Sequence, residues 1–160
     1  IFHFLYFYKD INNNMTIISH DYLKYWRVIR YWAKAKYKIS TPDIDLILFL
    51  YSEDYFNKSK FNEFTELMSW DVKRFDSLLS RGYIQVWRKG YGKNTTLYQL
   101  SYAGKTIARS IYRKLNGEEI GESANINPLF RKDASYTDKL YRNSIKKLNK
   151  FIRQQRYLSH

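Results

Sequence analysis

The sequence contains no cysteine, which excludes disulfide bonds, thiolate catalysis and a zinc site built on cysteine. Histidine is scarce, and His3, His20 and His160 have no spacing that could close a metal site. The only strongly apolar terminal run, residues 1–8, is far shorter than the roughly 20 residues that cross a bilayer. We therefore expect no metal, no cofactor and no membrane partner, and a location in the cytoplasm, or in a host cytoplasm if the protein is viral.

Acidic residues are also few. Lys and Arg number 28 against 15 for Asp and Glu, a net charge of +13, and residues 81–117 carry eight basic side chains and no acidic one. A bias of this size indicates a polyanionic partner, with nucleic acid ahead of an anionic membrane surface. In 160 residues, 44% hydrophobic and 19% aromatic residues are ample for a core, so we expect one folded unit.

The order of predicted elements is that of a mainly α-helical domain with a small β-hairpin. Helix periodicity covers residues 21–38, and Thr41-Pro42-Asp43 then provides a capping hydroxyl, a proline and a carboxylate for a second helix that is apolar nearly all round. Two short amphipathic helices follow and outline a helix-turn-helix, and two strands joined by a glycine-containing turn form a wing. These four segments are residues 61–68, 70–81, 83–88 and 95–100.

The whole chain divides into four parts. Residues 1–20 are an arm or an upstream extension, with Met15 as a candidate native start. The winged domain spans 21–117, with a last helix from the capping Ser101 to about Leu115, and 118–135 is a polar linker. Residues 136–160 form an amphipathic helix whose apolar stripe needs a partner, either the same helix of a second chain or the first helix of its own. We assign this stripe to dimerisation: Leu140, Tyr141, Ile145, Leu148, Phe151 and Ile152.

Over residues 21–115 the sequence resembles the MarR-type family of winged helix-turn-helix regulators. Three pieces carry the resemblance: residues 39–48 before the motif, 78–84 where the recognition helix turns into the wing, and 98–105 where the wing returns to a helix. The resemblance implies a homodimer whose second motif helix enters the major groove while the wing reaches along the backbone or minor groove. The Asp-x-Arg pair usual in the family's wing is absent, and the wing is short.

Carried onto this sequence, the resemblance gives two sets of candidate DNA contacts. In the recognition helix, Lys73 and Arg74 are suited to guanine or phosphate, Asp71 to cytosine or to a capping role, and Trp70 to a base contact or to a hydrophobic staple. The core-facing positions of that helix are expected to be Val72, Phe75, Leu78 and Leu79. The full sets are Trp70, Asp71, Lys73, Arg74 and Ser77 for the recognition helix, and Arg88, Lys89, Tyr91, Lys93 and Asn94 for the wing.

The function expected from these patterns is sequence-specific double-stranded DNA binding by a homodimeric transcriptional regulator. The alternative is a winged-helix module that binds DNA nonspecifically, or another protein, in viral replication, packaging or assembly. Catalysis is not expected, because Gly104-Lys105-Thr106 lacks the earlier glycine of a phosphate-binding loop. A small-molecule effector has no direct support, although Tyr22, Trp26, Tyr31 and Trp32 could line a pocket as well as a core.

Overall fold

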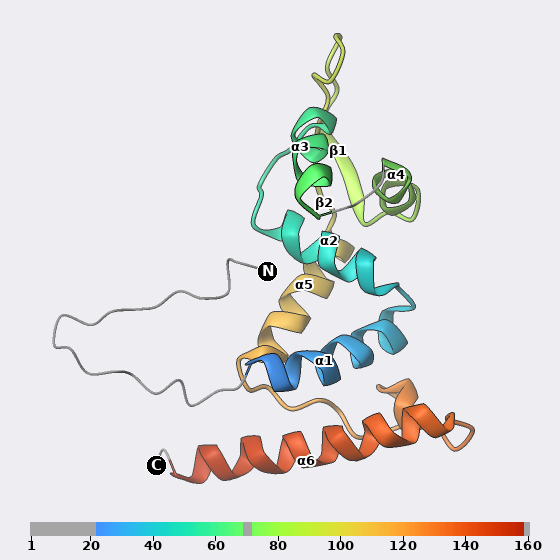
Figure 1. The fold of residues 1–160 in the computed structure, drawn as a ribbon, viewed down its shortest axis with the longest axis vertical. Helices are drawn as coiled ribbons and strands as arrows, with labels where there is room; N and C mark the ends of the chain where they lie inside the picture. Colours follow the sequence, from blue (N-terminus) through green and yellow to red (C-terminus); the bar gives the residue numbers. More distant parts are fainter. Residues whose placement is uncertain (1–21, 69–71, 159–160) are drawn as a thin grey trace, which may run out of the picture.

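The computed structural model describes residues 22–68 and 72–158, and it is mainly helical with one two-stranded antiparallel sheet in that part of the chain (Figure 1). This agrees with the predicted helical domain and small hairpin. The elements, in chain order, are α1 (Tyr22–Tyr37), α2 (Thr41–Tyr51), α3 (Lys58–Met68), α4 (Val72–Ser80), β1 (Ile84–Arg88), β2 (Leu97–Leu100), α5 (Tyr102–Leu115), the 3-10 helix η2 (Pro128–Phe130) and α6 (Tyr136–Leu158).

Helix α2 forms the centre of the fold, as its apolar sequence predicts. Ile44, Leu46, Ile47 and Leu50 are fully buried, so this helix has core contacts on most of its circumference. Its N-cap is Ser40 rather than the expected Thr41: the Ser40 hydroxyl accepts from the Asp43 backbone N–H, and the Asp43 carboxylate accepts from the Ser40 N–H. This reciprocal capping box satisfies two backbone donors at the helix start.

Helix α3 begins at Lys58, three residues before the predicted start, because the Asn57 side chain accepts a hydrogen bond of 2.7 Å from the Lys60 N–H. Helix α4 ends before Gly82, whose φ of +78° lies in the left-handed region that glycine adopts without strain. The predicted serine cap on the other side of the hairpin is also present: the Ser101 hydroxyl accepts from the Gly104 N–H at the start of α5.

The hairpin is joined to the helices by a third extended segment. Strands β1 and β2 pair antiparallel, with Ile84 opposite Leu100 and an irregularity between Val86 and Arg88. On the other side of β2, Phe56 and Tyr98 exchange two backbone hydrogen bonds of 3.0 and 2.8 Å. The loop between α2 and α3 is therefore fixed to the hairpin, so that the helix pair α3–α4 and the hairpin form one body.

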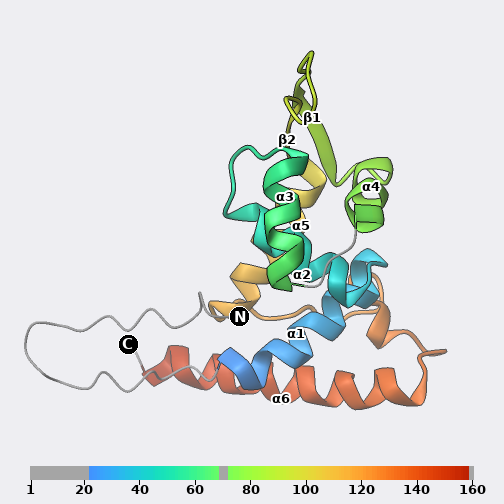
Figure 2. The same cartoon turned by 45° about the horizontal axis from the view of Figure 1, so that its top comes forward.

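The hairpin and α6 lie at opposite ends of the molecule. Figure 1 shows α6 and α1 side by side at the bottom, α5 rising from them past α2, and the hairpin projecting at the top; Figure 2, turned by 45°, shows the same order. None of the helices within 22–68 and 72–158 combines the length and the apolar character needed to cross a bilayer.

The segment that we expected to be a polar linker is instead packed into the fold. Ile120, Asn127 and Leu129 are each only 1% exposed. Asn149 of α6 holds this segment: its side chain accepts from the Ile120 N–H at 2.9 Å and donates to the Ile120 carbonyl at 2.7 Å. The acidic side chains also attach the segment to α6, because Glu119 and Glu122 both form ion pairs with Arg153. Polarity here reflects specific hydrogen bonding rather than solvation.

Most of the stripe that we assigned to dimerisation is covered by the protein's own helices. Ile145, Leu148 and Ile152 are buried in the core. Tyr141 stacks on Tyr31 of α1 with ring centroids 3.7 Å apart, and Phe151 contacts the Tyr25 ring. Leu140, in contrast, is 48% exposed. Of the two partners that the sequence left open, the structure has the chain's own first helix, so these residues do not offer a free dimer face.

Candidate nucleic-acid interface

The hairpin tip presents the predicted wing residues to solvent. Arg88, Lys89, Tyr91, Lys93 and Asn94 are all exposed, and the Tyr91 side chain is completely so. The turn is held by Thr95, whose hydroxyl accepts from the Gly92 N–H at 2.9 Å and donates to the Gly92 carbonyl at 2.8 Å. A Cβ at Gly90 would lie 2.0 Å from the Thr95 Oγ1, so the strands approach closely only because residue 90 is glycine.

Helix α4 is anchored against the hairpin by an aromatic cluster. The Phe75 ring lies 5.0 Å from Phe61, 5.1 Å from Tyr98 and 6.1 Å from Phe56, measured between centroids. Phe75 and Leu78 are buried, as predicted, but Val72, the first residue of α4, is 47% exposed and does not face the core. Two of the predicted contact residues, Trp70 and Asp71, lie outside the described residues.

The outward face of α4 carries less free positive charge than the sequence suggested. Lys73 is exposed, and Ser77 is half-buried. The exposed Asp76 pairs with Lys58 of α3 at 2.9 Å, and this hydrogen bond raises the pKa of the Lys58 ammonium. With Asp76 paired to Lys58 and Arg74 paired to Asp43, Lys73 is the side chain of α4 best placed to contact a polyanion.

The Arg74 side chain binds a carboxylate within the protein and is only partly exposed to solvent. Its Nη1 lies 2.9 Å from Oδ1 of Asp43, and Arg81 Nη1 lies 3.1 Å from Oδ2 of the same carboxylate, which is 7% exposed. Burial raises the pKa of Asp43, but hydrogen bonds from Ser40, Arg74 and Arg81 more than offset it and hold that pKa below its usual value. The carboxylate thus ties both ends of the α4 region to the start of α2.

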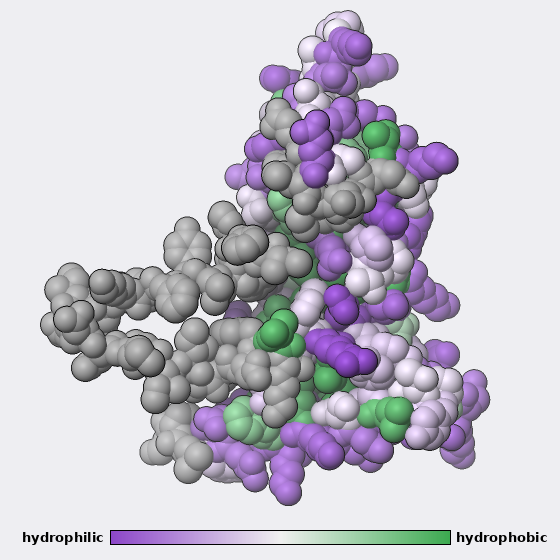
Figure 3. Space-filling model, in the orientation of Figure 1, coloured by the Kyte–Doolittle hydropathy of each residue, from purple (hydrophilic) through white to green (hydrophobic). Residues whose placement is uncertain are grey.

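The basic run of residues 81–117 separates in space into structural and free charges. Arg81 pairs with Asp43, and Arg113 and Lys114 both pair with Glu118 beyond the end of α5. The hairpin cations Arg88, Lys89 and Lys93 have no acidic partner among the described residues. Figure 3 shows hydrophilic side chains covering this projecting tip.

An aromatic pair that sequence reasoning missed lies where the paired strands end and the projecting turn begins. Tyr55, from the loop before α3, and Trp87 of β1 are each about half-exposed, with ring centroids 4.3 Å apart. The Arg88 guanidinium lies 5.5 Å from the Trp87 ring centre. The sequence offered one signal for this pair, a tryptophan in the predicted wing strand. No local pattern links residue 55 to residue 87. The two tilted rings add an apolar surface beside the hairpin cations.

The aromatic residues of α1 that could have lined an effector pocket are used in packing. Trp32 is 2% exposed, and Trp26 packs at the edge of the core. Tyr31 donates a hydrogen bond of 2.8 Å to Asp138 of α6. Burial is the largest cause and this hydrogen bond the next, and they raise the pKa of Tyr31 to about 12. The side chain of Tyr22 is outside the described residues, and the packing interpretation holds for the other three.

The arrangement combines a helix pair, a hairpin braced against it and a projecting basic tip, which is geometry suited to the phosphates of a duplex. A comparison of the chain with protein-family models, with curated proteins and with solved structures found no match.

Proposed function

We propose that this protein binds double-stranded DNA through α4 and the hairpin, as a MarR-like winged helix-turn-helix regulator that selects its sites by sequence. The observation that carries the proposal is the projecting hairpin, whose three cations have no acidic partner among the described residues. Unpaired cations on a narrow projection cost little in water, and on a duplex each contact with a phosphate releases counterions. In this proposal the hairpin supplies affinity and α4 supplies sequence selection.

The roles of the α4 residues follow from their surroundings. Lys73 is exposed and Ser77 is half-buried, and both are assigned to base or phosphate contacts. Arg74 is assigned to holding α4 in its orientation, because Asp43 already binds its guanidinium. The proposed homodimer needs an interface other than the α6 stripe. If the protein is such a dimer, its DNA target should have two half-sites about one helical turn apart.

Engagement of Arg74 also favours a second candidate function, nonspecific duplex binding. Arginine is the side chain most often used to read guanine, and this one is already hydrogen-bonded within the protein. In that case the hairpin would provide nearly all of the affinity, and α4 would contact the backbone only.

The test measures affinity for a random duplex of about 20 base pairs, roughly two helical turns, as a function of salt. The wing variant is K89Q/K93Q, and the matched control is K34Q/K38Q, which removes two exposed lysines at the same spacing of four residues on and just after α1. Each phosphate contact is worth about eightfold near 0.1 M salt, so the wing variant should bind about 60-fold more weakly, with a salt slope lower by about 1.8. The control should bind like wild type.

Equal affinities of the wing variant and the control would end the proposal of a DNA-binding hairpin. Selection from random duplexes then separates the two candidate functions. Enrichment of a motif that changes in a Lys73→Ala variant supports sequence-specific reading by α4. Tight binding without an enriched motif supports the nonspecific module.

A further inference from the structure

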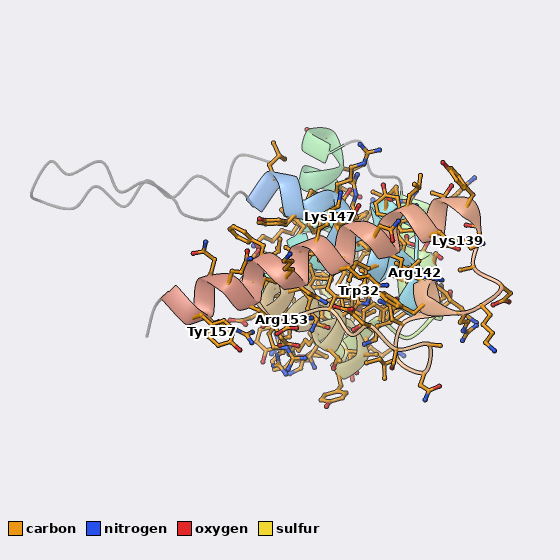
Figure 4. All side chains as sticks on the ribbon, turned by 90° about the horizontal axis from the view of Figure 1, so that it is seen from below. Trp32, Lys139, Arg142, Lys147, Arg153 and Tyr157 are labelled. Atoms are coloured by element: carbon orange, nitrogen blue, oxygen red, sulfur yellow. The ribbon has the colours of Figure 1, made fainter. Side chains whose placement is uncertain are left out.

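The outward face of α6 carries a row of lysines at the opposite end of the molecule from the hairpin. Lys139, Lys146, Lys147 and Lys150 are exposed, and in helical projection they fall on the side away from the buried Ile145. Figure 4, seen from the α6 end, shows this helix crossing the front of the molecule with Trp32 behind it. From Lys139 to Lys150 the row extends over about 16 Å at 1.5 Å per residue.

The basic residues of α6 divide by residue type into fixed and free. Its arginines are held within the protein: Arg142 donates to the Leu129 and Arg131 carbonyls, and Arg153 and Arg156 pair with Glu119. The four lysines have no acidic partner in the part of the chain that the structure describes. The planar guanidinium is suited to fixed hydrogen bonds, whereas the flexible ammonium is suited to contacts with a moving or variable array of anions.

Keeping these lysines together has an energetic cost. Lys150 lies four residues after Lys146 and three after Lys147, and like charges at these helical spacings destabilise a helix by about 0.2 to 0.5 kcal/mol per pair. Asp138 is the one acidic residue in residues 136–158, and it faces inward, accepting from Tyr31. A solvated helix face designed for stability alone would place acidic residues among the lysines.

We infer that this lysine face binds the phosphate backbone of a second duplex, so that one molecule bridges two DNA segments; this rests on the proposed function of the hairpin. The hairpin and α6 lie at opposite ends of the molecule in Figures 1 and 2, and the lysines are on the face of α6 away from the core, so a single straight duplex cannot reach both. A second copy of the chain is disfavoured as the occupant, because two lysine faces repel each other.

An anionic membrane surface is also a poorer fit than a duplex. A helix that lies in a membrane interface inserts a continuous apolar face. Here the apolar stripe of α6 is turned against α1, and the middle of the outward face carries Asn143 and lysines. Tyr136, Leu140 and Tyr157 are exposed toward the two ends of α6, but they form no continuous apolar stripe. The surface therefore offers charge without a continuous insertion face, which matches the requirements of phosphate binding without base reading.

The experiment is a bridging assay with the full chain. A duplex of about 20 base pairs is immobilised on beads, and capture of a second, fluorescent duplex is measured for wild type, K146Q/K150Q, K89Q/K93Q and K34Q/K38Q. We expect wild type and K34Q/K38Q to bridge. The α6 variant should retain its affinity for a single duplex and lose bridging affinity by about 60-fold near 0.1 M salt, from two lost phosphate contacts. An α6 variant with arginine at both positions should bridge.

Bridging by K146Q/K150Q at the wild-type level, with single-duplex binding intact, overturns the inference and leaves the proposed function standing. Vesicle binding that depends on Lys146 and Lys150, measured with phosphatidylserine vesicles, in the absence of bridging also overturns it. Loss of all duplex binding in K146Q/K150Q but not in K89Q/K93Q would instead overturn the proposed function of the hairpin, while showing that α6 is a DNA-binding surface.

Discussion

Replacing Asp43 with Asn tests whether the buried carboxylate sets the position of α4. The substitution preserves the shape of the side chain but removes its charge, so one acceptor oxygen remains for donors from Ser40, Arg74 and Arg81. A hydrogen bond to a charged group contributes about 1.5 to 3 kcal/mol, and the partial exposure of both arginines places the expected loss at the lower end. We expect the variant to be about 2 kcal/mol less stable.

Urea unfolding measures this difference. At a slope of about 2 kcal/mol per molar, the midpoint should fall by about 1 M. The matched control is Asp133→Asn, which changes an exposed carboxylate and should leave the midpoint unchanged. A double-mutant cycle with Arg74→Gln should give a coupling of about 1 kcal/mol between the two positions. A loss below about 0.5 kcal/mol in D43N would refute the role assigned to this carboxylate.

The pH dependence gives an independent check. Since the pKa of folded Asp43 lies below its ordinary value of 3.8, the charged carboxylate stabilises the folded state above that pH. This stabilisation is lost as the pH falls through the folded pKa. The stability gap between wild type and D43N should therefore be constant near neutral pH and should close in acid. A gap that persists at the lowest pH where both proteins fold would contradict the linkage.

Two further predictions concern the α6 contacts. Asn149→Leu should lower the free energy of unfolding by about 2 to 4 kcal/mol in urea melts, because it leaves both backbone groups of Ile120 without partners, and a loss under about 1 kcal/mol would show that they find others. Tyr31→Phe should lower the free energy of unfolding at neutral pH. The stability advantage of wild type should shrink as the pH rises from 10 toward 12, since the raised pKa of folded Tyr31 means that folding favours the neutral phenol. Unfolding curves at several alkaline pH values measure this, and an undiminished advantage at the highest pH would refute it.

Local signals predicted most of the secondary structure, because caps and turns are determined by neighbouring residues. Gly82 ends α4 with a positive φ, Ser101 caps α5, and the central burial of α2 follows from its apolar composition. The predicted capping residue of α2, Thr41, was wrong by one position. Both Ser40 and Thr41 carry a hydroxyl, and the capping box with Asp43 requires a spacing of three, which only Ser40 has.

The candidate site was harder to predict, because the partner of a charged side chain is a long-range property. Arg74 has the spacing of an exposed position on α4, and only the packing of α4 beside α2 brings it to Asp43, 31 residues earlier. The prediction of a linker before α6 was wrong for the same reason. The segment is held by Asn149, which bonds to Ile120, and by Arg153, which bonds to Glu119, and both partners are about 30 residues away in the sequence. The hairpin cations were easier, since a glycine-containing turn predicts exposure directly.

The cover that α6 provides for α1 bears on the order in which this chain can mature on the ribosome. Residues 22–115 leave the ribosome before α6 does, and one side of α1 then lacks its Tyr141 contact until α6 has emerged. A nascent chain that pauses before α6 has left the ribosome would display this apolar side of α1. Chaperone binding and protease sensitivity should therefore peak in this late interval of translation and fall once α6 has docked.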